Sequence, residues 1–195
     1  MKQTGLAVIG AICISAFGCG GGGDHQSGSN PSSAAASSGV STSPGLSETS
    51  YQNGHPISLS TSDSHTLHEE SEVVRIVNEY RVSIGLNALV STAALSDVAR
   101  AHSLHMIIHD FFAHQNPEGD SPGQRILKGG VLWSMAGENL AAGYTSPETA
   151  FDAWMNSPGH KENIERAEWV FTGVGVWVDP SSTYGTYYTQ NFSRP

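Results

Sequence analysis

Glu138 is the residue whose setting most clearly requires a chemical partner. Most of its neighbours are apolar or small, so its carboxylate is expected to be poorly solvated; they include Met135, Ala136, Leu140 and Ala141. A carboxylate moved from water into such a setting costs several kcal/mol unless a partner compensates its charge. Two histidines are candidate partners: His114, within the segment 111–117, and His160, which follows a Ser-Pro-Gly turn. We expect at least one imidazole to meet this carboxylate.

Three kinds of chemistry could use such a group. In the first, the carboxylate of Glu138 orients an imidazole for general acid–base work, as in hydrolytic sites. The candidate nucleophile is then Ser157, but it precedes a proline and lacks the Gly-x-Ser-x-Gly elbow. In the second, His114 and His160 bind a divalent metal such as zinc. In the third, which we favour, the groups form a polar network in the core, and the cavity binds a ligand or nothing.

A second group of histidines lies on one predicted helix. His102, His105 and His109 are spaced by three and four residues, a geometry that could present ligands to a metal. His102, however, falls in the centre of the apolar stripe of that helix. This position favours a buried histidine with a satisfied hydrogen bond over a metal ligand.

The helices and strands that must position these residues follow from the spacing of apolar residues and from helix-capping residues. Ser121 and Ser146 are expected N-caps, each followed by a proline at the first helical position. Helical spacing and these caps predict helices over 68–84, 92–109, 121–128, 147–155 and 160–164. Alternation over 170–178 and Tyr- and Thr-rich residues over 186–192 predict two strands joined by a hairpin connection. Helices followed by antiparallel strands indicate an α+β fold.

The N-terminal third has a different composition. An apolar stretch over 6–17, too short to span a bilayer, ends at Gly18-Cys19 and resembles a bacterial lipobox. We expect residues 1–19 to be a lipoprotein-type signal peptide with lipidated Cys19; the alternative is ordinary cleavage that gives a secreted soluble product. Residues 20–66 are rich in Ser and Gly and contain no Lys or Arg, which predicts a disordered linker. The folded domain is expected over 67–195.

The totals exclude some function classes. The net charge is −9 and no basic patch is present, so a nucleic-acid partner is not expected. Both cysteines, Cys13 and Cys19, lie in the N-terminal segment. The folded domain therefore has no internal disulfide and must be stabilised by burial.

Four motifs, in this order, resemble the bacterial branch of the CAP superfamily, which includes cysteine-rich secretory proteins, antigen 5 and pathogenesis-related proteins and is also called SCP-like. They are Phe-Phe-Ala-His at 111–114, Gly-Glu-Asn-Leu-Ala at 137–141, Trp-Met-Asn-Ser-Pro-Gly-His at 154–160 and Tyr-Thr-Gln-Asn-Phe at 188–192. The resemblance covers roughly 67–192. It implies a three-layer α-β-α sandwich with a C-terminal antiparallel sheet.

The resemblance also implies a central cavity lined by two His and two Glu. His114 and Glu138 match one of each, whereas Ser157 and Tyr187 occupy the positions of the second Glu and second His. His160 is typical of bacterial members and is expected to supply an imidazole to the same cavity. These five residues are the predicted binding site, with His114 and His160 as metal ligands if a metal such as zinc is held.

The resemblance implies a binding function, because members of the family share no single reaction. We expect an extracytoplasmic, lipid-anchored, monomeric module at the cell envelope, whose partner is a small molecule, a lipid or an envelope protein. No residue is assigned as catalytic. The alternative is a hydrolase or metal-dependent enzyme that uses His114, Glu138 and His160.

Overall fold

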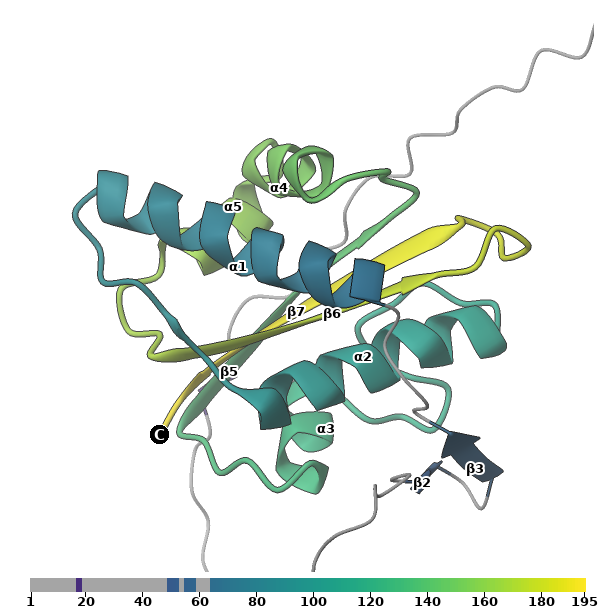
Figure 1. Ribbon diagram of the computed structural model, residues 1–195. Helices are drawn as coiled ribbons and strands as arrows, with labels where there is room; N and C mark the ends of the chain where they lie inside the picture. The colour runs from purple at the N-terminus through teal and green to yellow at the C-terminus, as the bar shows by residue number, and fades with distance from the viewer. Residues whose placement is uncertain (1–16, 19–48, 53–54, 59–63) are drawn as a thin grey trace, which may run out of the picture. The chain divides into compact units, whose positions relative to one another are not determined.

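A mixed five-stranded sheet forms the centre of the folded domain (Figure 1). The computed structural model describes residues 17–18, 49–52, 55–58 and 64–195. The strand order is β1-β5-β7-β6-β4. The strands are β1 (Phe17–Gly18), β4 (Val90–Ser91), β5 (Met135–Ala142), β6 (Phe171–Val178) and β7 (Thr186–Arg194). Strand β4 pairs parallel with β6, and the other pairs are antiparallel.

Helices cover both faces of this sheet. One layer contains α1 (Ser64–Ser83), α4 (Pro147–Met155) and α5 (Pro158–Glu165). The other contains α2 (Ala93–Ile108) and α3 (Pro122–Lys128), as Figure 1 shows. Separate apolar clusters fill the two interfaces, one around Trp154 and Phe192 and the others around Leu95 and Met106. The predicted α+β class and three-layer α-β-α sandwich are confirmed.

The register of β5 decides which layer each of its side chains meets. Glu138 pairs with Asn191 of β7, and Asn139 pairs with Gln190. Because successive side chains of a strand point to opposite faces, Glu138 and Asn139 face different helical layers. Glu138 contacts α3, and Asn139 contacts α5. The sequence had indicated the β6–β7 hairpin but not this strand.

Two glycines let α2 approach the sheet closely. A Cβ atom added to Gly173 would lie 2.3 Å from the backbone of α2, and one added to Gly175 would lie 2.0 Å from the amide nitrogen of Arg100. Ser103 of α2 completes the contact, because its hydroxyl donates to the carbonyl of Gly175 at 3.0 Å. The helix that carries His102 and His105, and whose C-cap is His109, is therefore fixed on β6.

The predicted helix starts at Ser121 and Ser146 are confirmed. Each forms a capping box, with proline at the first helical position of α3 and α4. Two other boundaries differ from expectation. The first helix begins at Ser64 rather than at about residue 68, and the fifth begins at Pro158, because Pro158 opens a helix as readily as it ends one.

The N-terminal segment lies largely outside the described residues, including Cys19 and most of the expected linker. Within the linker range, a separate unit contains a two-stranded antiparallel hairpin, β2 (Thr49–Gln52) and β3 (His55–Ser58). Of the helices that the structure describes, none combines the length and the apolar character needed to cross a membrane.

Candidate functional site

The carboxylate of Glu138 is held by two partners inside the domain. His114 Nδ1 lies 2.8 Å from Glu138 Oε1, and Arg125 Nη2 lies 2.6 Å from Glu138 Oε2. The side chains are 2%, 4% and 0% exposed for His114, Arg125 and Glu138 respectively. Both carboxylate oxygens are thus engaged away from solvent. We call these three residues the buried cluster.

Arg125 also organises the loop that precedes α3. Its Nη1 donates to the carbonyl of His114 at 2.6 Å and to the carbonyl of Asp120 at 3.0 Å. One guanidinium therefore joins the two ends of the loop to Glu138 on the central sheet. Charge-assisted bonds of this kind are shorter and stronger than neutral ones, which makes the loop part of the core.

The buried cluster keeps Glu138 ionised. Burial is the largest single effect and acts to raise the pKa of its carboxyl group, but Arg125, His102 and His114 together outweigh burial and lower the pKa to about 2. A general acid at neutral pH needs the opposite shift, toward the working pH. The charge on Glu138 therefore fits a partner of Arg125 better than a proton donor.

His102 is a core residue, as predicted. It is 1% exposed, and its Nε2 lies 3.0 Å from the carbonyl oxygen of Ala113. Nε2 therefore carries the proton in the neutral ring, because a carbonyl can only accept. Burial lowers the pKa of His102 to about 4. This agrees with the core role that was favoured over a metal-binding role for His102.

His160 does not share the layer of the buried cluster. It is completely buried in α5, and its carbonyl accepts a hydrogen bond from the side chain of Asn139 at 3.2 Å. Asn163, one turn later, donates to the carbonyl of Glu138 at 3.2 Å and thus ties α5 to β5. The sheet therefore separates the helix of His160 from His114 and Arg125. We expected His114, Glu138 and His160 to share one cavity. Instead, Glu138 pairs with His114 and Arg125, and His160 lies on the other side of the sheet.

Ser157 and Tyr187 are also apart from the buried cluster. Ser157 is the partly exposed N-cap of α5, on the far layer, and makes no capping bond with its side chain. Tyr187 faces the same side of the sheet as Glu138, but its register partner is Ala142. Four residues of strand separate Ala142 from Glu138, about 13 Å. Tyr187 packs with Phe112 and Tyr184, with ring centroids 6.5 and 5.6 Å away.

The buried cluster does not fit the expected metal. A divalent cation bound by His114 and His160 would need both imidazoles on the same side of the sheet. His114 lies in the loop before α3, whereas His160 lies in α5, in the opposite layer. It would also have to share the Glu138 carboxylate with the guanidinium of Arg125, 2.6 Å from Oε2. Like charges at that spacing repel strongly in a buried site. We therefore derive no chemistry through a metal here.

Acid–base chemistry at the buried cluster cannot use the predicted nucleophile. A proton on His114 Nδ1, directed at Glu138, would leave Nε2 as the basic atom of the neutral ring. The predicted nucleophile Ser157, however, begins α5 in the opposite layer. The geometry that the described residues provide is that of a polar network that fixes a loop to the sheet.

Arg125 is the cluster member that the sequence interpretation missed. The sequence does narrow the choice, because a carboxylate in an apolar setting needs a cation and the chain has only nine Lys and Arg residues. The position of Arg125 in the sequence gives no sign of burial, because arginine is mostly exposed in folded proteins.

A groove lies away from the buried cluster, at the junction of α4 and α5. It has a volume of about 640 Å³ and is lined by the end of α4, by α5 and by residues 165–168. Its walls carry charges of both signs, among them Lys161, Glu162 and Glu168. This is an open depression whose walls are partly polar and partly apolar.

Comparison with known proteins identifies the domain. The model of the CAP family, described as the cysteine-rich secretory protein family, matches residues 74–192. YkwD of Bacillus subtilis is 38% identical over 123 residues, 63% of this chain and 46% of that protein. The membrane protein YlbC of the same organism is 33% identical over 125 residues, 64% of this chain and 34% of its own length. The chain spans less than half the length of these relatives.

Solved structures share the architecture. An extracellular protein of Bacillus anthracis that contains an SCP domain superposes with a TM-score of 0.61 at 31% identity, over 67% of this chain and 41% of that one. An outer surface protein of Borrelia burgdorferi superposes with a TM-score of 0.58 at 24% identity, over 64% of this chain and 90% of that one. The second match bears on the fold alone.

Proposed function

Since this chain belongs to the CAP family of cysteine-rich secretory proteins, we propose that it acts as an extracytoplasmic binding module, held at the cell envelope by a lipid on Cys19. Two similarities support the location: the Bacillus anthracis structure is that of an extracellular protein, and YlbC is a membrane protein. The apolar stretch over 6–17 followed by Cys19 supports the anchor.

One observation carries the choice of binding over catalysis. Both oxygens of Glu138 are engaged by His114 and Arg125, and the Glu138 side chain is 0% exposed. A substrate could reach this carboxylate only by displacing a buried partner, which would leave an uncompensated charge. The residues most suited to catalysis by type are thus committed to holding the fold together.

The groove at the α4–α5 junction is the surface we assign to the partner. Its openness and its charges of both signs suit a protein surface better than an acyl chain, which would need an enclosed, apolar site. Asn163 and Arg81 hold α5 in place from beneath: Asn163 bonds to β5, and Arg81 Nη1 donates to the carbonyl of Ile164 at 2.6 Å. A rigid helix of this kind can present a fixed pattern of charges.

Site-specific photo-crosslinking in intact cells tests the binding surface. A photoreactive residue at Glu162, which lines the groove, should give a discrete protein adduct. The matched control is the same residue at Leu127 on α3, which is 52% exposed on the opposite layer and should give none. Equal adduct patterns from both positions, or none from Glu162, would refute the assignment of the groove.

A turnover screen tests the rival function. Purified protein is assayed against ester, peptide and phosphoester substrates beside Glu138→Gln, with circular dichroism as the check of folding. We expect no turnover that depends on Glu138. Hydrolysis lost in both His114→Ala and Glu138→Gln, with the fold retained, would establish the enzyme instead.

A further inference from the structure

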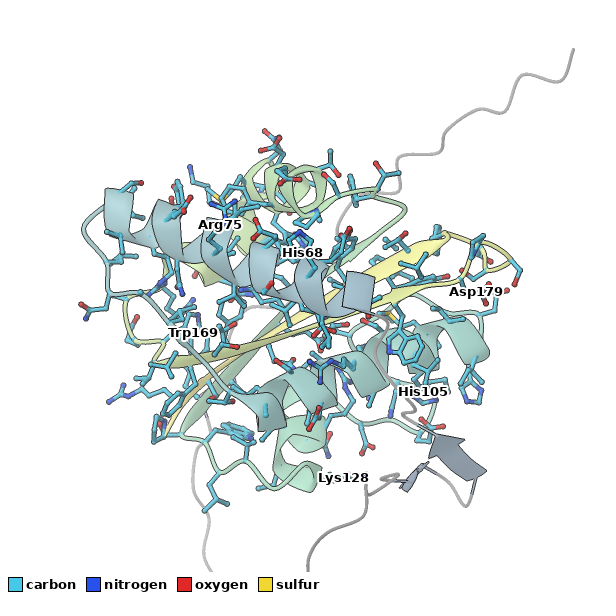
Figure 2. The ribbon with its side chains drawn as sticks, in the orientation of Figure 1. His68, Arg75, His105, Lys128, Trp169 and Asp179 are labelled. Atoms are coloured by element: carbon cyan, nitrogen blue, oxygen red, sulfur yellow. The ribbon has the colours of Figure 1, made fainter. Side chains whose placement is uncertain are left out.

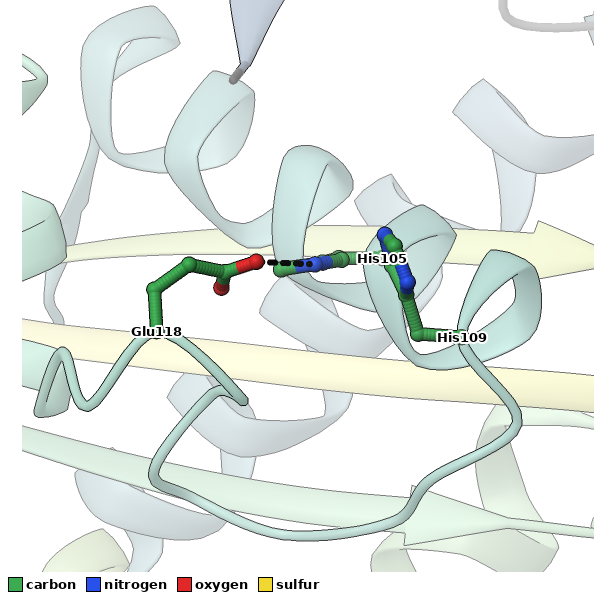
Figure 3. A group of neighbouring side chains, drawn as sticks. All are labelled: His105, His109 and Glu118. Carbon is green, nitrogen blue, oxygen red and sulfur yellow. Dashed lines mark ion pairs between the residues drawn. The ribbon is translucent and has the colours of Figure 1, made fainter.

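A group of potential metal ligands lies outside the buried cluster, at the end of α2. His105, His109 and Glu118 each offer one ligand atom, and these atoms all lie within 4.8 Å of one another. His105 Nε2 is 3.4 Å from Glu118 Oε1, and the ring centroids of His105 and His109 are 4.4 Å apart. Figure 3 shows the carboxylate of Glu118 directed at the His105 ring, with the His109 ring beside it.

The helix dictates the pairing of the two imidazoles. His105 lies in the last turn of α2, and His109 is the C-cap residue four positions later, so the two rings meet at the end of the helix. The same i, i+4 spacing is used by helices that bind zinc with two histidines. Because α2 is fixed against β6 at Gly173 and Gly175, the helix holds its position. Figure 2 shows His105 on that helix.

A short ordered turn brings Glu118 to the same place. The amide of Gly119 donates to the carbonyl of Asn116 at 2.9 Å, and the amide of Asp120 donates to Asn116 Oδ1 at 2.6 Å. Arg125 holds the end of this turn through the carbonyl of Asp120. The carboxylate therefore comes from a braced loop, 13 residues after His105 in the sequence.

The ring of His105 is held in place by its surroundings, because its side chain is buried. His105 is 4% exposed. Its Nδ1 is a buried atom that makes no hydrogen bond within the part of the chain that the structure describes.

We propose that His105, His109 and Glu118 form a divalent-metal site of the zinc class, with a fourth position open to water or to a partner. Two imidazole nitrogens and one carboxylate oxygen are ordinary zinc ligands, at bond lengths of about 2.0–2.2 Å. Tetrahedral ligands at that bond length lie roughly 3.3 Å apart, which small rotations of the exposed His109 and Glu118 can reach. The ion joins the end of α2 to the loop between His114 and Arg125.

The test is a zinc titration of the full chain by calorimetry, followed by thermal unfolding with and without zinc. His109→Ala and Glu118→Gln are the decisive variants, because both side chains are exposed and their replacement should preserve the fold. His109→Ala should bind one zinc equivalent fewer than the parent, and Glu118→Gln should weaken that equivalent by about tenfold or more. Zinc should raise the melting temperature of the parent and not that of His109→Ala.

The matched control is His68→Ala, another exposed histidine, which lies on α1. It should keep the parent's zinc stoichiometry and its shift in melting temperature. The measured quantity is the difference in bound zinc between the parent and each variant. Zinc held by histidines elsewhere in the chain therefore does not affect the result. The proposal is overturned if the parent binds no zinc, or if His109→Ala and the parent bind equal numbers of equivalents.

Discussion

Arg125 Nη2 lies 2.6 Å from Glu138 Oε2, and both side chains are withdrawn from solvent. This ion pair joins α3 to β5, and Arg125 also closes the loop that precedes α3 by donating to the carbonyl of His114. A buried pair of this kind is not a large source of net stability, because both charges lose their hydration. Its importance lies in what happens when one member is removed.

Replacing Arg125 by Met should destabilise the domain by about 3–5 kcal/mol, because the Glu138 charge would remain buried without a cation. Urea denaturation followed by tryptophan fluorescence measures the change. Lys128→Ala on the same helix is the control: its side chain is 67% exposed, and its pair with Asp120 is a surface contact worth about 0–1 kcal/mol. Figure 2 shows Lys128 at the end of α3. Similar losses in both variants would argue against the buried pair.

The stability of the domain should fall as the pH drops below about 6.5, and His102 should account for part of that fall. Burial lowers the pKa of His102 from 6.5 to about 4, so between these values the unfolded chain binds a proton that the folded one does not. The unfolding free energy should therefore decrease by at most about 1.4 kcal/mol per pH unit on this account. Urea denaturation between pH 7 and pH 4 measures the slope.

The variant that tests this pH effect is His102→Gln. Glutamine does not titrate, but its amide nitrogen can still donate to the carbonyl of Ala113. The variant should show a shallower slope between pH 6.5 and pH 4, whatever its absolute stability. An unchanged slope would show that His102 titrates normally in the folded protein.

Gly175→Ala should strongly destabilise the packing of α2 on the sheet. The added Cβ would lie 2.0 Å from the amide nitrogen of Arg100, a backbone atom that can move only with the helix. Overpacking of this kind typically costs about 1–3 kcal/mol. Gly85→Asn, at an open position with φ +83, is the control and should cost less, since asparagine tolerates that conformation. Thermal unfolding of the two variants provides the comparison, and equal melting temperatures would contradict it.

Cys19→Ala should move the protein from the membrane fraction to the soluble fraction of cells that export it. The expectation follows from the proposed lipid on Cys19, because the substitution removes the thiol that would carry it. Immunoblotting of fractions gives the readout, with Cys13→Ala as the matched control that should stay in the membrane. Unchanged partition of the Cys19 variant would refute the anchor.

The sequence predicted the elements whose signals are local. Ser121-Pro122 and Ser146-Pro147 identified two helix starts, because a capping side chain and a proline act on the first turn alone. The β6–β7 hairpin followed from alternation around a turn. Family motifs extended this to the three-layer architecture, which helix and strand patterns alone do not specify.

Strand β5 was missed because its residues do not resemble a strand. Met-Ala-Gly-Glu-Asn-Leu-Ala-Ala lacks β-branched and aromatic side chains, and its pairing partner, β7, lies about fifty residues later. Small residues fit there because helices cover both faces: the indole of Trp169, for example, lies over Gly137. Only tertiary packing explains that choice.

The site was anticipated in part for a related reason. His114 and Glu138 were paired correctly from chemical need, but the sequence could not show that Glu138 and Asn139 face opposite layers until the strand was known. His160 was therefore placed on the wrong side of the sheet. Glu118 was overlooked because a carboxylate in a polar loop gives no sign of the helix face it meets.

The most direct test of the account is a carbon-13 NMR titration of the Glu138 carboxyl group. Arg125 and its neighbours lower the pKa of this group from 4.5 to about 2, against the effect of burial, so the folded protein should keep the carboxylate ionised. We predict no titration of this signal between pH 7 and pH 4. The stability that the charge confers should be lost only as the pH falls from about 4.5 toward about 2. A titration midpoint above 4.5 would contradict the account and restore Glu138 as a candidate general acid.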